Sequence, residues 1–231
     1  MNFVISPPPV VSVPVVGRSE RFPVHRIYCV GRNYVAHAQE MGFSGREPPF
    51  FFLKPADALV VAEGPQPTLV PYPSLTSDLH HEIECVVAIG RGGRNILAAD
   101  AEQHVFGYAV GVDLTRRDLQ ASMKQQGRPW CIGKAFDHSA PIGPITEAAQ
   151  AGDIGRASIW LQVNGRERQR SDLGQLIWNV GEIIEHLSRA WELQAGDLIY
   201  TGTPEGVGSL VRGDLLTGGV EGLQGIALRL A

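Results

Sequence analysis

The chain has 231 residues, of which 44% are hydrophobic and 19% are charged, a composition typical of a globular domain. Its net charge of −4 and the lack of a Lys/Arg run beside aromatic residues argue against nucleic-acid binding, and no stretch of ~18 apolar residues predicts a membrane span. The 27 glycines and 16 prolines predict many turns between short strands.

The first 25 residues are rich in valine and proline, a pattern that favours an extended arm and excludes a helix. They lack a basic start and a small-residue cleavage site, so we expect no signal peptide. Three cysteines without CxxC spacing fit a reducing cytoplasm, and the apolar neighbours of Cys29, Cys85 and Cys131 predict buried thiols. We therefore expect a Pro-rich arm at residues 1–25 and one folded domain at residues 26–231.

Strand signals dominate the domain. Most are short apolar runs, and the pair Asn164-Gly165 between two alternating runs indicates a type I′ hairpin. The predicted strands cover residues 27–31, 50–53, 83–90, 107–114, 159–170 (the hairpin), 197–202 and 225–230.

Helices are fewer. Asn33 is placed to cap a short helix that ends near Met41, and Thr115 with Asp118 resembles the capping box of a second helix. Apolar residues at helical spacing predict the longest helix at residues 176–193. Because strands outnumber helices and few strand–helix–strand repeats occur, we expect a β-rich α+β fold with peripheral helices.

Two glutamates mark the start of the third predicted strand. In the sequence HHEIECVV the residues alternate, so Glu82 and Glu84 project from one face with their Cα atoms roughly 6.5–7 Å apart. Two carboxylates at that spacing repel each other unless a cation lies between them. A solvent-exposed edge, where two glutamates cost little, is the alternative.

Asp113 follows the continuous apolar run GYAVGV, which places its carboxylate at the rim of the core. It is either a helix cap or, together with Glu82 and Glu84, the third member of a set of hard oxygen ligands. Such a set suits Mg²⁺, Mn²⁺ or Ca²⁺, whereas His and Cys ligands would point to zinc.

His37 and Glu40 stand i,i+3 on the first predicted helix, so their side chains can meet. A carboxylate beside an imidazole orients the ring and raises its basicity, as a general base requires; a surface pair without function is the alternative.

Lys134 and Lys54 stand among apolar residues, where a buried ammonium needs an anionic partner unless the side chain reaches solvent. The TGTPEGVG loop at residues 201–208 offers hydroxyls and backbone N–H groups to a carboxylate, unless it is a simple turn.

Seven motifs follow one another along the chain: GRNYVAHAQEMG, PFFFLKPADA, LHHEIE, GYAVGVDLTRRDLQ, GRPWCIGKAFD, WLQVNG and GDLIYTGTPEGVG. Each is weak alone, but their order is specific, and over roughly residues 26–230 the chain resembles the fumarylacetoacetate hydrolase family. Within that family it is most similar to the short acylpyruvate hydrolases, among them bacterial fumarylpyruvate hydrolases. The resemblance implies a mixed β-sandwich roll of the family's C-terminal type, and a homodimer.

The resemblance also implies roles for individual residues. His37 and Glu40 match the dyad that activates water, and Lys134 matches a lysine near the substrate oxygens. The implied ligands of Mg²⁺ or Mn²⁺ are Glu82, Glu84 and Asp113. The positions that match those binding the pyruvoyl carboxylate and keto groups are Lys54, Arg117, Gln120 and Thr203.

The implied reaction is hydrolysis of the carbon–carbon bond in a 2,4-dioxo acid. Water activated by His37 attacks the C4 carbonyl, and the cation and Lys134 stabilise the departing pyruvate enolate. The expected substrate is fumarylpyruvate, which gives fumarate and pyruvate in gentisate catabolism. Its distal carboxylate calls for a cation in the pocket, for which the candidates are Arg32, Arg46 and Arg128.

Two other functions stay open. Family members also decarboxylate oxaloacetate or isomerise 2-hydroxyhepta-2,4-diene-1,7-dioate through a metal-held enolate, although His37 and Glu40 favour hydrolysis because decarboxylation needs no water-activating dyad. A non-catalytic Ca²⁺-binding β-sandwich module is the alternative from another class. It has no use for a His–Glu pair or for buried lysines.

Overall fold

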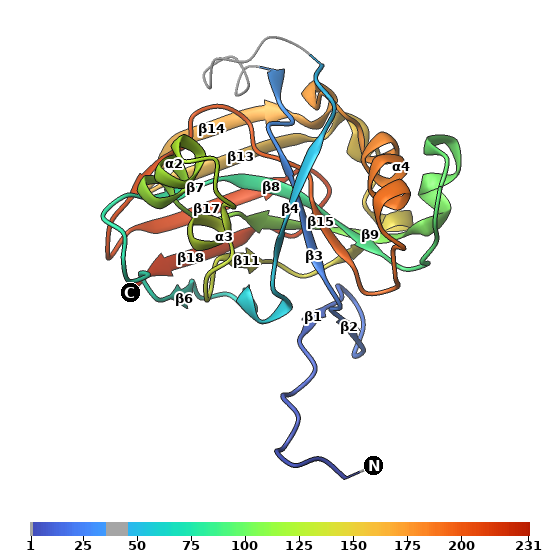
Figure 1. Ribbon diagram of the computed structural model, residues 1–231, viewed down its shortest axis with the longest axis horizontal. Helices are drawn as coiled ribbons and strands as arrows, with labels where there is room; N and C mark the ends of the chain where they lie inside the picture. The colour runs from blue at the N-terminus through green and yellow to red at the C-terminus, as the bar shows by residue number, and fades with distance from the viewer. Residues whose placement is uncertain (1, 36–45) are drawn as a thin grey trace.

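The computed structural model describes residues 2–35 and 46–231 of the chain (Figure 1). His37 and Glu40, and most of the helix expected to carry them, therefore lie outside the described residues. None of the helices in the described part has the length and apolar character that crossing a membrane requires.

The largest sheet in the described residues has eight strands: β3 (Ile27–Gly31), β4 (Phe50–Lys54), β5 (Leu59–Val61), β8 (Ile83–Ile89), β9 (Val105–Val112), β11 (Ala140–Ile142), β12 (Thr146–Glu147) and β15 (Leu198–Tyr200). Seven of them follow the order β4-β3-β15-β8-β9-β11-β5, and β12 pairs with β9. The sheet is mixed, because β3 runs parallel to β15 and β11 runs parallel to β5, while the other neighbours are antiparallel.

A second sheet has five strands in the order β14-β13-β17-β18-β6. Their bounds are β6 Thr68–Val70, β13 Ser158–Val163, β14 Arg166–Asp172, β17 Leu215–Val220 and β18 Ile226–Leu230. The predicted hairpin is confirmed: Asn164 and Gly165 join β13 to β14 with φ angles of 52° and 75°, and a type I′ turn requires positive φ at both positions.

The main hydrophobic core lies between these two sheets. It combines apolar side chains of the large sheet, such as Cys85 and Val110, with side chains of the five-stranded sheet, such as Leu161, Leu216 and Leu228. Burial on facing sides of two sheets is the arrangement of a sandwich. The predicted β-rich α+β architecture is confirmed.

Two smaller sheets complete the strands. β7 (Leu79–His81) lies between β10 (Thr115–Arg116) and β16 (Gly208–Leu210), with both pairs antiparallel. Near the N-terminus, β1 (Ser12–Pro14) and β2 (Arg21–Pro23) form a hairpin that buries Val13 and Phe22 in a second apolar cluster beneath the large sheet. Residues 12–24 thus pack onto the body, whereas the chain before them extends away from it (Figure 1).

The helices lie at the periphery, as expected. They are α2 (Arg117–Gln125), α3 (Cys131–Lys134), α4 (Val180–Ala190) and the 3₁₀ turns η1 (Ala56–Ala58), η2 (Ala98–His104), η3 (Ala148–Gln150), η4 (Ile154–Arg156) and η5 (Leu173–Gln175). α4 buries Ile183, Ile184 and Leu187 against the large sheet. It is shorter than the predicted 176–193 because Asn179 caps its N-terminus in a capping box with Glu182.

Two local predictions are wrong. Thr115 does not cap α2: it belongs to β10, and its hydroxyl contacts Lys134 and the carbonyl of Asp113. Asp118 instead accepts hydrogen bonds from Thr76 Oγ1 and from two backbone N–H groups. Cys131 is exposed, unlike the buried Cys29 and Cys85, because it begins a short surface helix.

Candidate functional site

The register of β8 and β9 brings three carboxylates together. Glu82 immediately precedes β8, Glu84 is its second residue, and Asp113 follows β9. Because the strands are antiparallel, the beginning of β8 lies beside the end of β9, and Asp113 N donates to Glu82 O at 2.8 Å. A carboxylate oxygen from each of the three residues lies within 4.8 Å of those of the other two.

These carboxylates are buried, which makes their charges costly. Relative exposures are 5% for Glu82, 2% for Glu84 and 0% for Asp113. Burial, followed by the charges of Asp113 and Glu82, raises the pKa of Glu84 well above its ordinary value. The exposed edge considered for Glu82 and Glu84 is therefore wrong, and the cluster requires nearby positive charge.

Two lysines supply part of that charge. Lys134 on α3 donates to Asp113 Oδ2 at 2.6 Å, to Thr115 Oγ1 at 2.7 Å and to Glu82 Oε2 at 2.8 Å. Burial by itself lowers the pKa of Lys134, but Asp113 and Glu82 outweigh it, and the pKa lies above its ordinary value. Lys54, at the end of β4, lies 2.9 Å from Asp113 Oδ1. Both lysines are thus buried and ion-paired rather than extended to solvent.

Arg117 and Gln120 reach the cluster from the first turn of α2. The Arg117 guanidinium donates to Glu82 and, at 2.5 Å, to Gln120 Oε1. α3 packs close to this turn because position 133 is glycine: a Cβ on Gly133 would lie 2.8 Å from the backbone nitrogen of Gln120. The close approach brings Lys134 and Arg117 to the same carboxylate, Glu82.

The loop after β15 lies on another side of the carboxylate cluster. The N–H of Gly202 donates to Glu84 Oε2 at 2.7 Å, at a φ of +100° that favours glycine. Thr203 is buried next to it, and its hydroxyl accepts a hydrogen bond from Gln169 Nε2 at 2.8 Å. Thr203 therefore follows directly on the residue that binds Glu84, but the Thr203 hydroxyl itself contacts Gln169.

Two contributors to this site were not identified from the sequence. Thr115 accepts from Lys134, and Gln169 on β14 joins the backbone N–H of Ile83 to the loop at Thr203. Neither has a local signal, because each acts on a residue at least nineteen positions away. The Gly202 N–H belongs to the loop at residues 201–208, which the sequence indicates can offer backbone N–H groups to a carboxylate, and the carboxylate that it binds is that of Glu84.

The residues present fit a divalent cation. Asp113 Oδ1 is buried and accepts no hydrogen bond within the described residues, although Lys54 is near it. Glu84 receives the Gly202 N–H and faces two further carboxylates. Three converging hard oxygen donors match the ligand preferences of Mg²⁺ and Mn²⁺.

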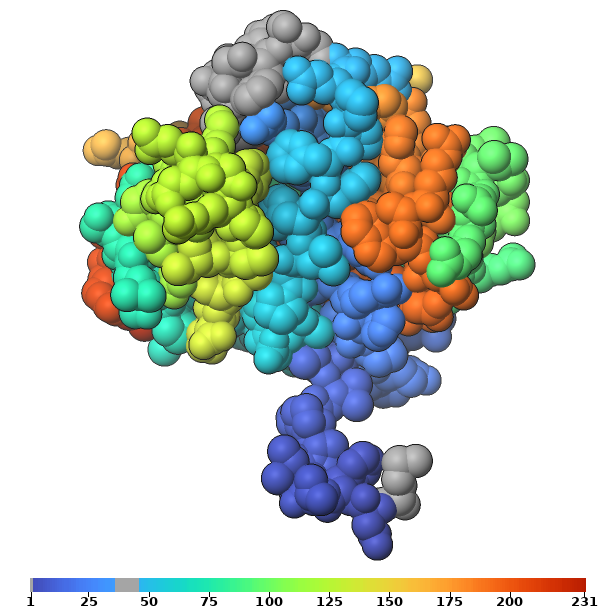
Figure 2. Space-filling view, viewed as in Figure 1, coloured from blue at the N-terminus to red at the C-terminus, as the bar shows by residue number. Residues whose placement is uncertain are grey.

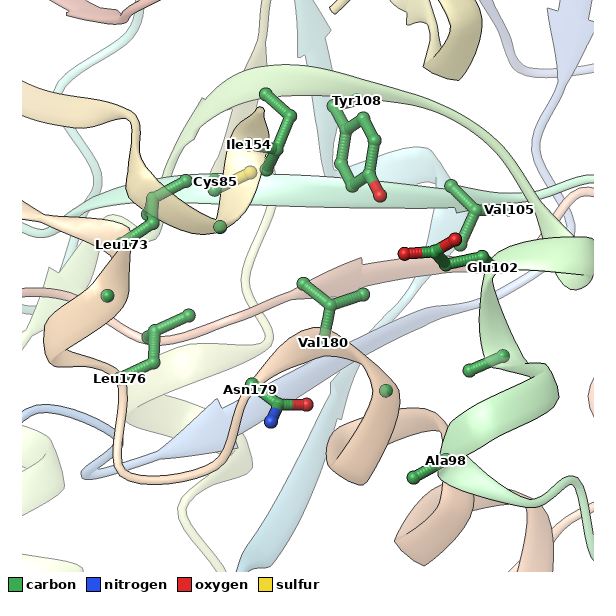
Figure 3. A pocket seen from close by; sticks show the side chains of 14 residues that line it. Cys85, Ala98, Glu102, Val105, Tyr108, Ile154, Leu173, Leu176, Asn179 and Val180 are labelled. Atoms are coloured by element: carbon green, nitrogen blue, oxygen red, sulfur yellow. The ribbon is translucent and has the colours of Figure 1, made fainter. Parts of the chain in front are cut away.

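A separate cavity of about 430 Å³ lies on the other side of β8 (Figure 3). Successive side chains of a strand point to opposite faces, so Cys85 lines this cavity while Glu84 faces the carboxylate cluster. Its walls also include Tyr108, Leu173 and Val180. The carboxylate cluster therefore does not open into it.

The family named "Fumarylacetoacetate (FAA) hydrolase C-terminal" matches residues 26–230. The chain belongs to the fumarylacetoacetate hydrolase family. Its β-rich fold with few helices is the family's fold, as expected from the seven motifs. This family includes hydrolases, isomerases and oxaloacetate tautomerases.

Several known proteins are closely similar to this chain. A crystal structure of fumarylpyruvate hydrolase from Pseudomonas aeruginosa in complex with Mn²⁺ and pyruvate is 55% identical, covers 100% of this chain and 99% of that chain, and has a TM-score of 0.97. The fumarylpyruvate hydrolase of a Ralstonia species is 44% identical over 79% of this chain and 92% of its own. An oxaloacetate tautomerase of Escherichia coli is 40% identical over 85% and 88%, respectively.

Proposed function

We propose that this protein is a divalent-metal-dependent hydrolase that cleaves the carbon–carbon bond of a 2,4-dioxo acid, and that its substrate is fumarylpyruvate. The products are then fumarate and pyruvate, as in gentisate catabolism in the cytoplasm. The observation that carries the proposal is the buried set Glu82, Glu84 and Asp113, whose oxygens converge within 4.8 Å next to the ammonium of Lys134. The 55% identical fumarylpyruvate hydrolase supports the choice of substrate.

The proposed ligands of Mg²⁺ or Mn²⁺ are Glu82, Glu84 and Asp113. When bound, the cation supplies Lewis acidity and positive charge that favour an enolate over the ground-state ketone. Lys54 ion-pairs with Asp113 Oδ1 and Lys134 ion-pairs with Asp113 Oδ2, so this carboxylate is fixed before any ligand binds. Such preorganisation keeps the reorganisation cost of binding low.

The other proposed roles follow from charge and position. Lys134 is buried and its pKa lies above the ordinary value, so its positive charge can stabilise a nearby oxygen that becomes negative during cleavage. Lys54, Arg117, Gln120 and Thr203 are proposed to bind the pyruvoyl carboxylate and keto groups. His37 is proposed to take a proton from water, with Glu40 orienting the imidazole; this pair is inferred from the sequence, since it lies outside the described residues.

The test is a substrate panel of fumarylpyruvate, acetylpyruvate and oxaloacetate with Mg²⁺ and with Mn²⁺. We expect metal-dependent loss of acylpyruvate absorbance in the ultraviolet, faster for fumarylpyruvate than for acetylpyruvate. His37→Ala should lower kcat by about 10²–10⁴ while metal affinity is kept. Rapid turnover of oxaloacetate with no acylpyruvate cleavage would instead favour the tautomerase or decarboxylase reactions of the family.

We further propose a homodimer. Light scattering on the purified protein should give twice the mass of one chain. A mass equal to a single chain at micromolar concentration would contradict this assignment.

A further inference from the structure

A groove of about 420 Å³ lies between β4 and α3, outside the carboxylate cluster. In the space-filling view the segment around residue 50 runs beside the lobe formed by residues 117–134 (Figure 2). The side chains that line the groove include Phe50, Phe52, Arg128, Trp130, Cys131 and Lys134, and none of its lining residues is acidic.

The walls of the groove are aromatic. Phe50 and Trp130 form an edge-to-face pair with ring centroids 5.4 Å apart, and Phe52 lies 6.3 Å from the same indole. The Phe50 ring lies directly over β3, where a Cβ on Gly31 would come within 2.0 Å of it. Any residue larger than glycine at position 31 would therefore displace the Phe50 ring from this wall. Aromatic walls favour a flat, conjugated ligand.

Lys134 lines the groove and also contacts the carboxylate cluster. Its Nζ lies 5.1 Å from the centre of the Phe52 ring and 2.8 Å from Glu82 Oε2. Lys134 is therefore the residue that the groove and the carboxylate cluster share.

The outer end carries a positive charge. Arg128 is exposed and forms no ion pair with any carboxylate in the described residues. The other two arginines considered for this role are differently placed: Arg46 pairs with Glu182 and stacks on Trp178. Arg32 stacks over the Phe50 ring at 5.1 Å, as part of the wall.

We infer that this groove binds the acyl arm of the substrate and that Arg128 pairs with a carboxylate at the far end of that arm. The inference rests on the proposed function, and it names the substrate class: acylpyruvates whose acyl group is planar and ends in a carboxylate. Aromatic walls contact the conjugated carbon chain, and the guanidinium matches a carboxylate with two parallel hydrogen bonds.

The direct test measures binding rather than turnover. Fumarate and crotonate are a matched pair, because a methyl group in crotonate replaces one carboxylate of fumarate. Calorimetry on the Mn²⁺-loaded protein with pyruvate present should show that Arg128→Met weakens fumarate binding about tenfold or more and leaves crotonate within twofold. Arg156→Met, which removes an exposed arginine elsewhere, should change neither.

Kinetics give a second readout. Arg128→Met should lower kcat/KM for fumarylpyruvate about tenfold or more and leave acetylpyruvate, which lacks a distal carboxylate, nearly unchanged. Equal losses on both substrates, or no loss on either, would overturn the assignment of Arg128. The proposed function fails separately, if the wild-type protein cleaves no acylpyruvate at all; the fumarate and crotonate affinities are measured without turnover and still decide the role of Arg128.

Discussion

At the scale of single residues, the site balances buried charges of both signs. Glu82 contacts Lys134 and Arg117, and Asp113 contacts Lys134 and Lys54. A buried ion pair contributes little when intact, because desolvation offsets the attraction, but removing one partner leaves an uncompensated charge. Lys134, Lys54 and Arg117 therefore hold the Glu82 and Asp113 side chains in place before a cation binds.

Replacing Lys134 tests this balance. In the metal-free protein, Lys134→Met should lower the free energy of unfolding by about 3–5 kcal/mol, because Glu82 and Asp113 lose their shared ammonium. Urea denaturation in the presence of a chelator measures the change, with the exposed Arg156→Met as the control. A loss below about 1 kcal/mol, the value typical of a surface pair, would mean that these charges are not effectively buried.

Residue-scale prediction succeeded where a local pattern carries the geometry. Alternation placed Glu82 and Glu84 on one face, and the apolar run before Asp113 placed that carboxylate at the end of a strand. The same reasoning failed for Thr115, whose sequence context is that of a helix cap. Its hydroxyl contacts Lys134, nineteen residues later, and no local rule detects such a contact.

At the scale of elements, α4 shows how a cap sets the start of a helix. Asn179 Oδ1 accepts from Glu182 N at 3.0 Å, and Glu182 Oε2 accepts from Asn179 N at 3.0 Å. Periodicity predicted this helix, but it extended the start to residue 176 because the apolar pattern continues past the cap. Leu176 instead follows a 3₁₀ turn and bridges to Tyr34.

The cap of α4 gives a prediction about stability. Asn179→Ala removes the side-chain acceptor and should cost about 1 kcal/mol, which lowers the Tm of a chain of this size by roughly 2–4 °C. Differential scanning calorimetry measures the shift. Asn179→Asp, which keeps an acceptor at the N-terminus, should retain wild-type stability; if it loses as much as the alanine variant, the cap is not the cause.

At the scale of the whole molecule, the site depends on the meeting of segments remote in sequence. The longer apolar strands, such as β8 and β9, and the Asn164-Gly165 turn were predictable, because each is a local signal of period or φ. β17, in the middle of the five-stranded sheet, was not predicted. The order of the strands was not, and it is the pairing of β8 with β9 and β15 that gathers Glu84, Asp113 and the Gly202 N–H. The family resemblance supplied this grouping in advance; residue spacing alone did not.

The most direct test of the account is Mn²⁺ binding followed by electron paramagnetic resonance of the free ion. We predict one Mn²⁺ per wild-type chain, and a loss of affinity above about 100-fold in Glu84→Gln and in Asp113→Asn, since removing a ligand should exceed the 10- to 100-fold effect typical of outer-shell changes. Asp153→Asn, at an exposed carboxylate far along the chain, should bind as wild type does. Wild-type protein that binds no Mn²⁺, or variants that bind it unchanged, would contradict the claim that these carboxylates form a metal centre.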